Sequence, residues 1–166
     1  MAILVLDMFE VDDMPIQEWF QGCDEEVYIF TRAEVVDDYK KVGFSNVKGF
    51  KSYSNNSIIE LETLELMKEK NIDKIFICDE RDVIRGAKLR ERFNIKGQSY
   101  ESALAYRNKV IMKSYLVNHG LKVPPFMEIK SVYDVLKFVE IHGYPIIIKP
   151  IDLYAAINTV IIYSYN

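Results

Sequence analysis

The chain has 166 residues, of which 49% are hydrophobic and 28% charged, a balance typical of a globular protein with a buried core. Its net charge is −4, and its basic residues alternate with acidic ones on predicted helices, which argues against a protein that coats nucleic acid. No stretch approaches the ~18 apolar residues of a membrane span, and the N-terminus lacks the features of a signal peptide. We therefore expect a cytoplasmic protein that contacts neither nucleic acid nor membrane.

The first half of the chain alternates β-rich runs with helical patterns. The fourth run, IFIC, is fully apolar, which is typical of a strand buried in the centre of a sheet between two helix layers. Ser57 and Glu60 have the spacing of a capping box at the start of one helix. The alternation predicts an α/β fold, a Rossmann-like parallel sheet with helices on both faces, over residues 1–97. The expected strands are 1–6, 26–30, 46–53 and 74–78, and the expected helices are 14–22, 33–42, 57–70 and 81–93.

A domain boundary is expected near Gly97–Ser99, where the pattern changes. Residues 98–166 predict a smaller α+β unit that cannot bury both faces of its sheet alone. One of its helices is strongly amphipathic, with Val132, Val135, Leu136 and Val139 on one face. The expected helices are 101–119 and 131–142, and the expected strands are 126–129, 144–149 and 159–163.

Several familiar site motifs are missing. The first strand is followed by MFEVDDMP, which has no glycine, so a nicotinamide or flavin domain is disfavoured, and there is no Walker loop. The acidic residues of that segment lack the spacing of a calcium loop and are interpreted as solvated. Neither Cys23 nor Cys78 has metal-site spacing, and Cys78 is interpreted as a core thiol. The two histidines each end a helix beside a glycine, which favours a capping role, so we assign no catalytic residue and no metal ligand.

Three polar residues remain as candidates. Lys149 ends the apolar run YPIII and Lys109 opens a helix, and an ammonium at such an edge suits a phosphate oxygen. Glu80 lies in the tripeptide that directly follows the fourth strand, at the end of the sheet where ligands of open α/β folds bind. The alternative is that Asp79 or Asp82 of the same segment simply caps the next helix.

The stretch from Arg107 to Pro150, with Lys109, the turn VPPF and Lys149 in this order, resembles the ATP-grasp superfamily of carboxylate ligases and carboxylases. The resemblance covers Lys74–Tyr163, and the first seventy residues only by pattern. It implies a preATP-grasp domain over residues 1–97 and part of an ATP-grasp A subdomain over 98–166. It further implies that Lys109 and Lys149 contact ATP phosphates, that Glu80 faces a small carboxylate substrate, and that Mg accompanies ATP in the complete enzyme.

The chain departs from the family pattern at two places. The family's glycine-rich loop after the second lysine is replaced by IDLYAAINT, where Ala155 and Ala156 remain small. The chain also stops before the adenine-binding hinge and before the lobe that holds magnesium. We therefore expect a truncated or split ligase, inactive alone, that forms a homo-oligomer or needs a C-terminal lobe. The alternative is a non-enzymatic interaction module that keeps the fold and pairs with another chain.

Overall fold

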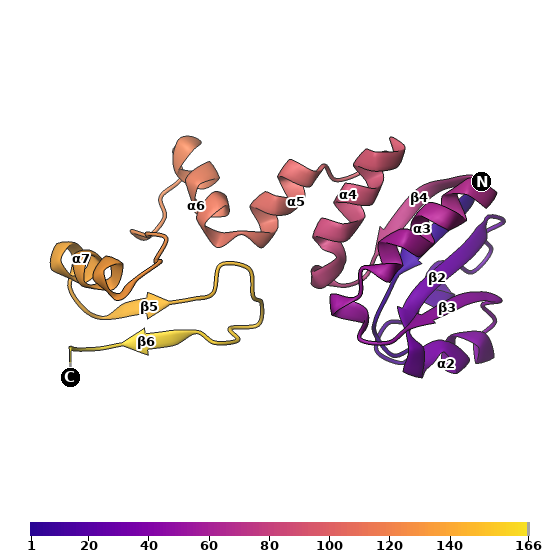
Figure 1. Cartoon of the computed structure of the whole chain (residues 1–166), viewed down its shortest axis with the longest axis horizontal. Coiled ribbons are helices and arrows are strands. Elements are labelled where there is room, and N and C mark those ends of the chain that lie inside the picture. Colours follow the sequence, from indigo (N-terminus) through magenta and orange to yellow (C-terminus); the bar gives the residue numbers. More distant parts are fainter. Residues whose placement is uncertain (166) are drawn as a thin grey trace. The chain divides into compact units, whose positions relative to one another are not determined.

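The computed structural model describes residues 1–165, which form two compact units, residues 1–100 and residues 101–165. The first unit is a four-stranded parallel sheet with helices, and the second combines helices with a small antiparallel hairpin (Figure 1). The α/β class expected from the sequence is confirmed. Within the described residues, no helix is both long and apolar enough to cross a membrane.

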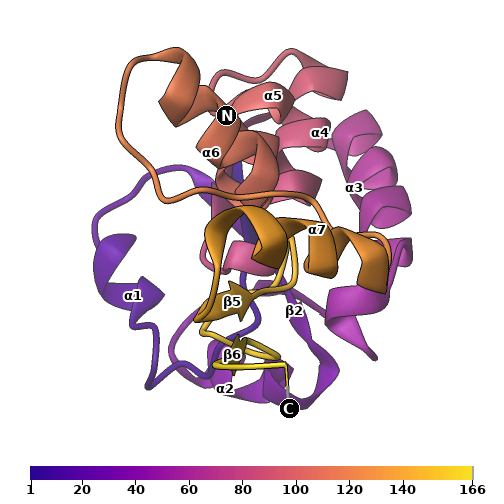
Figure 2. The same cartoon turned by 90° about the vertical axis from the view of Figure 1, so that its left-hand side faces the viewer.

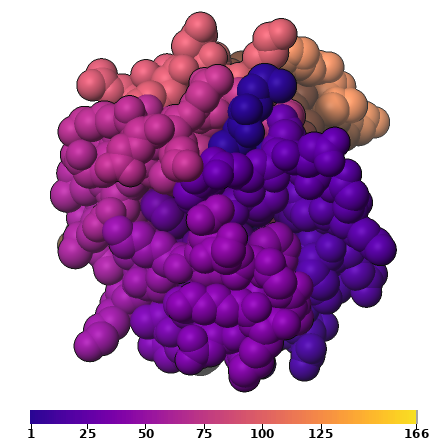
Figure 3. Space-filling model, turned by 90° about the vertical axis from the view of Figure 1, so that its right-hand side faces the viewer, coloured from indigo at the N-terminus to yellow at the C-terminus, as the bar shows by residue number. Residues whose placement is uncertain are grey.

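The sheet of the first unit has the strand order β3-β2-β1-β4. All its strand pairs are parallel, with Leu4 of β1 opposite Tyr28 of β2 and Ile75 of β4. Figure 3 shows the N-terminal residues, in indigo, reaching the surface of this unit between violet and magenta segments, as this order requires. The strands are β1 (Ala2–Leu6), β2 (Glu26–Arg32), β3 (Asn46–Phe50) and β4 (Ile72–Ile77).

Helices cover both faces of this sheet because its inner strands are apolar on both sides. Alternate residues of β1 belong to two separate cores: Leu4 and Leu6 pack with Ile59 of α3 and Leu89 of α4, whereas the opposite face packs with α1 and α2. Figure 1 shows α3 and α4 on one side of the sheet and α2 on the other. The helices are α1 (Ile16–Trp19), α2 (Val36–Lys41), α3 (Ile58–Glu69) and α4 (Val83–Phe93).

Gly49 of β3 allows the segment that leads into α2 to pack closely against the sheet. A Cβ added to Gly49 of β3 would lie 2.7 Å from the Cα of Ala33, which is closer than side-chain atoms pack. Larger residues at position 49 would therefore displace the segment that leads into α2.

The second unit contains three helices and the hairpin. Ile146 of β5 is opposite Ile162 of β6, and α7 lies beside β5 (Figure 2). Ser131 and Asp134 form a capping box at the start of α7. The elements are α5 (Tyr100–Arg107), α6 (Lys109–Asn118), α7 (Val132–His142), β5 (Ile146–Ile148) and β6 (Val160–Ile162).

Two predictions about the first unit were wrong. The strand that contains Ile75 lies at the edge of the sheet, and Phe76 is 41% exposed there. An apolar run indicates burial but cannot tell a central strand from an edge strand covered by its neighbours. The Ser57–Glu60 capping box is also absent: the Asn56 side chain accepts from the Ile58 N–H, and Glu60 instead binds Arg85.

Two predictions about the second unit were also wrong. The expected strand 126–129 is irregular, and the expected single helix 101–119 is two helices. The break occurs because Asn108 has an extended backbone, and its side chain accepts hydrogen bonds from the N–H groups of Val110 and Ile111.

Candidate functional site

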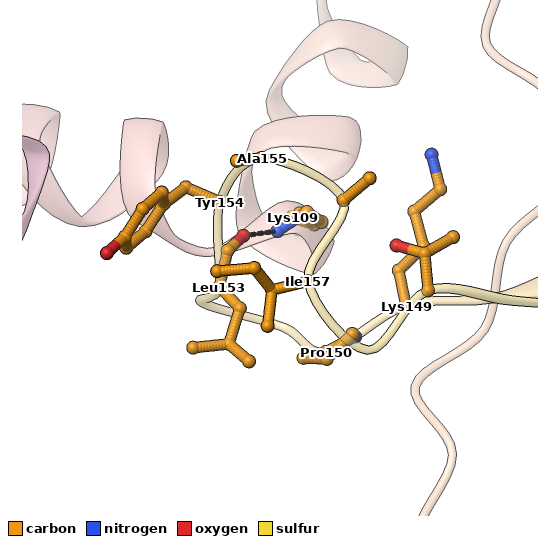
Figure 4. A pocket seen from close by; sticks show the side chains of 9 residues that line it. Lys109, Lys149, Pro150, Leu153, Tyr154, Ala155 and Ile157 are labelled. Atoms are coloured by element: carbon orange, nitrogen blue, oxygen red, sulfur yellow. Dashed lines mark hydrogen bonds between the residues drawn. The ribbon is translucent and has the colours of Figure 1, made fainter.

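Lys109 is the first residue of α6, and the break between the helices fixes its position. The Asn108 cap begins α6 at this residue, and the Lys109 N–H donates to the carbonyl of Ile151 at 3.0 Å. The Lys109 ammonium donates to the carbonyl of Leu153 (Figure 4). The lysine is thus attached twice to the loop that follows β5, although the two segments lie more than forty positions apart in sequence.

Lys149 directly follows β5, and its side chain lines the same cavity as Lys109. The cavity has a volume of about 140 Å³ and is otherwise lined by the loop, including Tyr154, Ala155 and Thr159. In Figure 4 the Lys149 side chain extends from the strand end, while Lys109 reaches the loop from the helix side. The structure therefore brings together the two lysines singled out in the sequence.

The loop between the two strands has an unusual backbone. Ala155, Ala156 and Asn158 adopt left-handed conformations, with φ of 50°, 58° and 56°. Residues with a Cβ rarely adopt this conformation, which costs an alanine about 1–2 kcal/mol. The loop thus has the backbone shape that glycine favours, even though IDLYAAINT contains no glycine.

Arg107 is a site residue that the sequence reasoning missed. It is the last residue of α5, and its guanidinium donates to the carbonyl of Asp152 at 2.6 Å and lies 5.9 Å from the ring of Tyr154. These two contacts flank Leu153, whose carbonyl binds Lys109. A cation two positions before Lys109 was the only available signal, because contacts across forty-five residues leave no trace in local pattern.

Glu80 belongs to the first unit and is exposed in the short 3-10 turn Glu80–Asp82 that precedes α4. It does not line the cavity of the two lysines. The neighbouring Asp79 accepts from the Arg81 N–H and also binds the Arg81 guanidinium through both carboxylate oxygens. Asp79 therefore caps the 3-10 turn that leads into α4, whereas Asp82, at the N-cap of α4, makes no side-chain capping bond.

Buried carboxylates mark the same end of the sheet. Asp7 directly follows β1, is fully buried, and accepts from the Tyr39 hydroxyl at 2.8 Å and the Phe9 N–H at 2.9 Å. Burial raises the pKa of Asp7 above 3.8, although these two bonds offset part of the rise. Burial also raises the pKa of Asp82, which binds Arg85. The signal in the sequence was an acid directly after an apolar strand.

Within the part of the chain that the structure describes, no metal site is found. Among residues 1–165, no group of three or more His, Cys, Asp or Glu side chains could hold a metal ion. The cavity itself has no carboxylate in its lining. Magnesium prefers carboxylate, phosphate and water oxygens, and the lining of this cavity offers it no carboxylate. The two ammonium groups, by contrast, suit the oxygens of a phosphate chain.

No protein-family model matches the chain. It is 38% identical over 103 residues to the L-arginine-specific L-amino acid ligase of Bacillus subtilis, a match that covers 62% of this chain and 25% of that protein. It is also 38% identical over 60 residues to the carbamoyl phosphate synthase large chain of Thermotoga sp. (strain RQ2), covering 36% of this chain and 6% of that protein.

Several solved structures share the fold. The N5-carboxyaminoimidazole synthetase of Staphylococcus aureus complexed with ADP superimposes with a TM-score of 0.75 and 21% identity, over 99% of this chain and 42% of that one. The L-amino acid ligase of Bacillus licheniformis has a TM-score of 0.70 and 19% identity, over 99% and 40%. The chain spans less than half the length of each of these relatives. The chain is therefore similar to part of several ATP-grasp enzymes, in sequence to the first two and in fold to the last two.

Proposed function

We propose that the chain is the N-terminal part of an ATP-dependent carboxylate–amine ligase or carboxylase of the ATP-grasp type. The carrying observation is that Lys109 and Lys149 line one cavity, from two elements that are far apart in sequence. Neither lysine forms an ion pair within residues 1–165, so both positive charges are available to a polyanion. We assign both as contacts for ATP phosphates.

In the complete enzyme, the reaction would transfer the γ-phosphoryl group of ATP to a carboxylate. An amine would then attack the acyl phosphate and release phosphate. Such transfers depend on positioning and on neutralising charge, and the two ammonium groups provide part of that neutralisation. We place Glu80 on the substrate side. Because the cavity has no carboxylate in its lining, the proposal assigns no residue of this chain to the metal.

A chimeric enzyme tests the proposal directly. The region of the Bacillus subtilis ligase that matches this chain would be replaced by the chain, and amino-acid-dependent phosphate release would be measured. We expect turnover, and we expect Lys149→Ala to lower it by at least about a hundredfold, because the variant loses a charge that stabilises the transferring phosphoryl group. Lys122→Ala is the matched control, since this lysine is exposed and does not line the cavity. A folded but inactive chimera would contradict the proposal.

The isolated chain should bind ATP only weakly. Two charge-assisted contacts contribute about 1.5–3 kcal/mol each, whereas immobilising a free ligand costs at least about 4 kcal/mol. We therefore expect millimolar affinity at best by isothermal titration with ATP and Mg, and no turnover. Turnover by these 166 residues alone would contradict this part of the proposal.

A second candidate is an interaction module without chemistry. The observation that favours it is the hairpin surface, where Ile147 and Ile161 face each other across the strands and are 57% and 48% exposed. Such apolar surface commonly marks a contact with another chain. An inactive chimera combined with no measurable binding of ATP or tripolyphosphate would favour this candidate.

A further inference from the structure

The loop after β5 is held down by the junction between α5 and α6. Arg107 contacts it on both sides of Leu153, through the Asp152 carbonyl and the Tyr154 ring. A guanidinium is suited to this pair of contacts, because its planar fork donates a hydrogen bond while its face or edge meets an aromatic ring. Lys109 adds two more contacts to the same four-residue stretch, through its N–H and its ammonium.

This seated loop competes with any phosphate ligand of Lys109. The Leu153 carbonyl takes one of the three N–H groups of the Lys109 ammonium, which the proposed function assigns to ATP. The remaining cavity of about 140 Å³ is smaller than the ~300–1,000 Å³ typical of sites for small molecules. A nucleoside triphosphate can therefore bind only if the loop moves away from Arg107 and Lys109.

We propose that Arg107 is a positioning residue that latches the loop Ile151–Tyr154 over Lys109, so that polyphosphate binds only after the latch opens. The inference rests on the proposed function, because that function supplies the ligand. The latch consists of the two Arg107 contacts, with the Asp152 carbonyl and the Tyr154 ring, and it is formed when no ligand is bound. Only molecules with an open loop can bind polyphosphate. The apparent dissociation constant is therefore the dissociation constant of the open state divided by the fraction of molecules that are open. Weakening the latch should therefore tighten binding.

The first measurement is amide hydrogen exchange in the full chain without ligand. Arg107→Ala should speed the exchange of the loop amides by about tenfold, because opening is no longer opposed by a charge-assisted bond and a ring contact. Arg107→Lys should do nearly the same, since it keeps the charge but loses the planar fork. Arg92→Ala is the matched control, as Arg92 is exposed in the last turn of α4 in the first unit. Unchanged loop exchange in both Arg107 variants would overturn the inference.

The second measurement is the affinity for ATP and for inorganic tripolyphosphate. Arg107→Ala should bind both about threefold to tenfold more tightly than the wild type, and Lys109→Met should lose binding. Weaker binding by Arg107→Ala, together with faster exchange, would overturn the inference and assign Arg107 to the phosphates themselves. No binding by wild type or Arg107→Ala at millimolar ligand would overturn the assignment of Lys109 as a phosphate contact in this chain, while the exchange rates would still decide whether Arg107 holds the loop.

Discussion

At the scale of single residues, Ala155 and Ala156 adopt a left-handed backbone conformation that is sterically unfavourable for alanine. Replacing Ala155 or Ala156 with glycine removes the steric cost of this conformation, about 1–2 kcal/mol, and adds about 0.5–1 kcal/mol of chain entropy on unfolding. We expect each change to stabilise the second unit by about 0.5–1 kcal/mol in urea unfolding. Ala105→Gly, in the right-handed α5, should instead destabilise it by about 1 kcal/mol. Destabilisation by both loop glycines would contradict the observed backbone.

The buried Asp7 leads to a prediction about pH. Its folded pKa is raised above the unfolded value of 3.8, so the folded state holds the proton more tightly, and stability falls as pH rises through the folded pKa. Asp7→Asn removes the buried charge and should gain stability relative to wild type as pH rises from 4 to 8. Each unit of difference between the two pKa values corresponds to about 1.4 kcal/mol.

Urea unfolding of Asp7→Asn and wild type across this pH range would measure the effect. The control is Asp12→Asn, because Asp12 is exposed and should leave the pH profile unchanged. A stability difference between Asp7→Asn and wild type that stays constant with pH would contradict the burial of an ionisable carboxylate at this position.

At the scale of elements, the Asn108 cap both ends one helix and places Lys109. Asn108→Ala should cost about 1 kcal/mol of stability, since two N–H groups lose their acceptor. Asn108→Asp should retain most of the stability, because a carboxylate also caps well. Asn118→Ala, at the exposed end of α6, is the control and should have little effect. Equal costs at positions 108 and 118 would show that the cap is unimportant.

The sequence indicated most elements correctly because periodicity and apolar runs are local signals. All four strands of the first sheet were expected, and so were the helix starting at 132 and the hairpin strands. The expectations from the sequence were wrong where two local signals competed. Asn56 took the capping role expected of Ser57, and Asn108 interrupted a pattern that is apolar enough for one long helix.

The candidate site was predictable only in part. Lys109 and Lys149 were recognised from their order along the chain, and the structure places both on one cavity. The Leu153 carbonyl could not be predicted, because every residue has a carbonyl and only the folded loop aims this one at Lys109. Glu80 as a substrate contact stays a prediction.

At the scale of the whole molecule, the exposed hairpin predicts self-association. Ile147 and Ile161 form a cross-strand pair, and Val160 beside them is 53% exposed. We expect a homodimer or higher oligomer at tens of micromolar by light scattering, because apolar patches of this kind favour burial. The double change Ile147→Lys and Ile161→Glu should give a monomer while preserving the strand pair through opposite charges. A wild-type monomer at that concentration would contradict the prediction.

The hydrogen bond from Lys109 to the Leu153 carbonyl affects how ligand affinities should be measured in solution. A carbonyl is a neutral acceptor, so the loop takes one of the three ammonium N–H groups without cancelling the positive charge. The cavity therefore keeps two positive charges and no acid in its lining, whether or not the loop moves. Sulfate or phosphate from a buffer will compete with a nucleotide for these charges when the loop is open, and added salt will weaken the binding of all of them. Affinities measured for this chain will thus depend on the counterions present, and a chloride buffer of low ionic strength will give the tightest values.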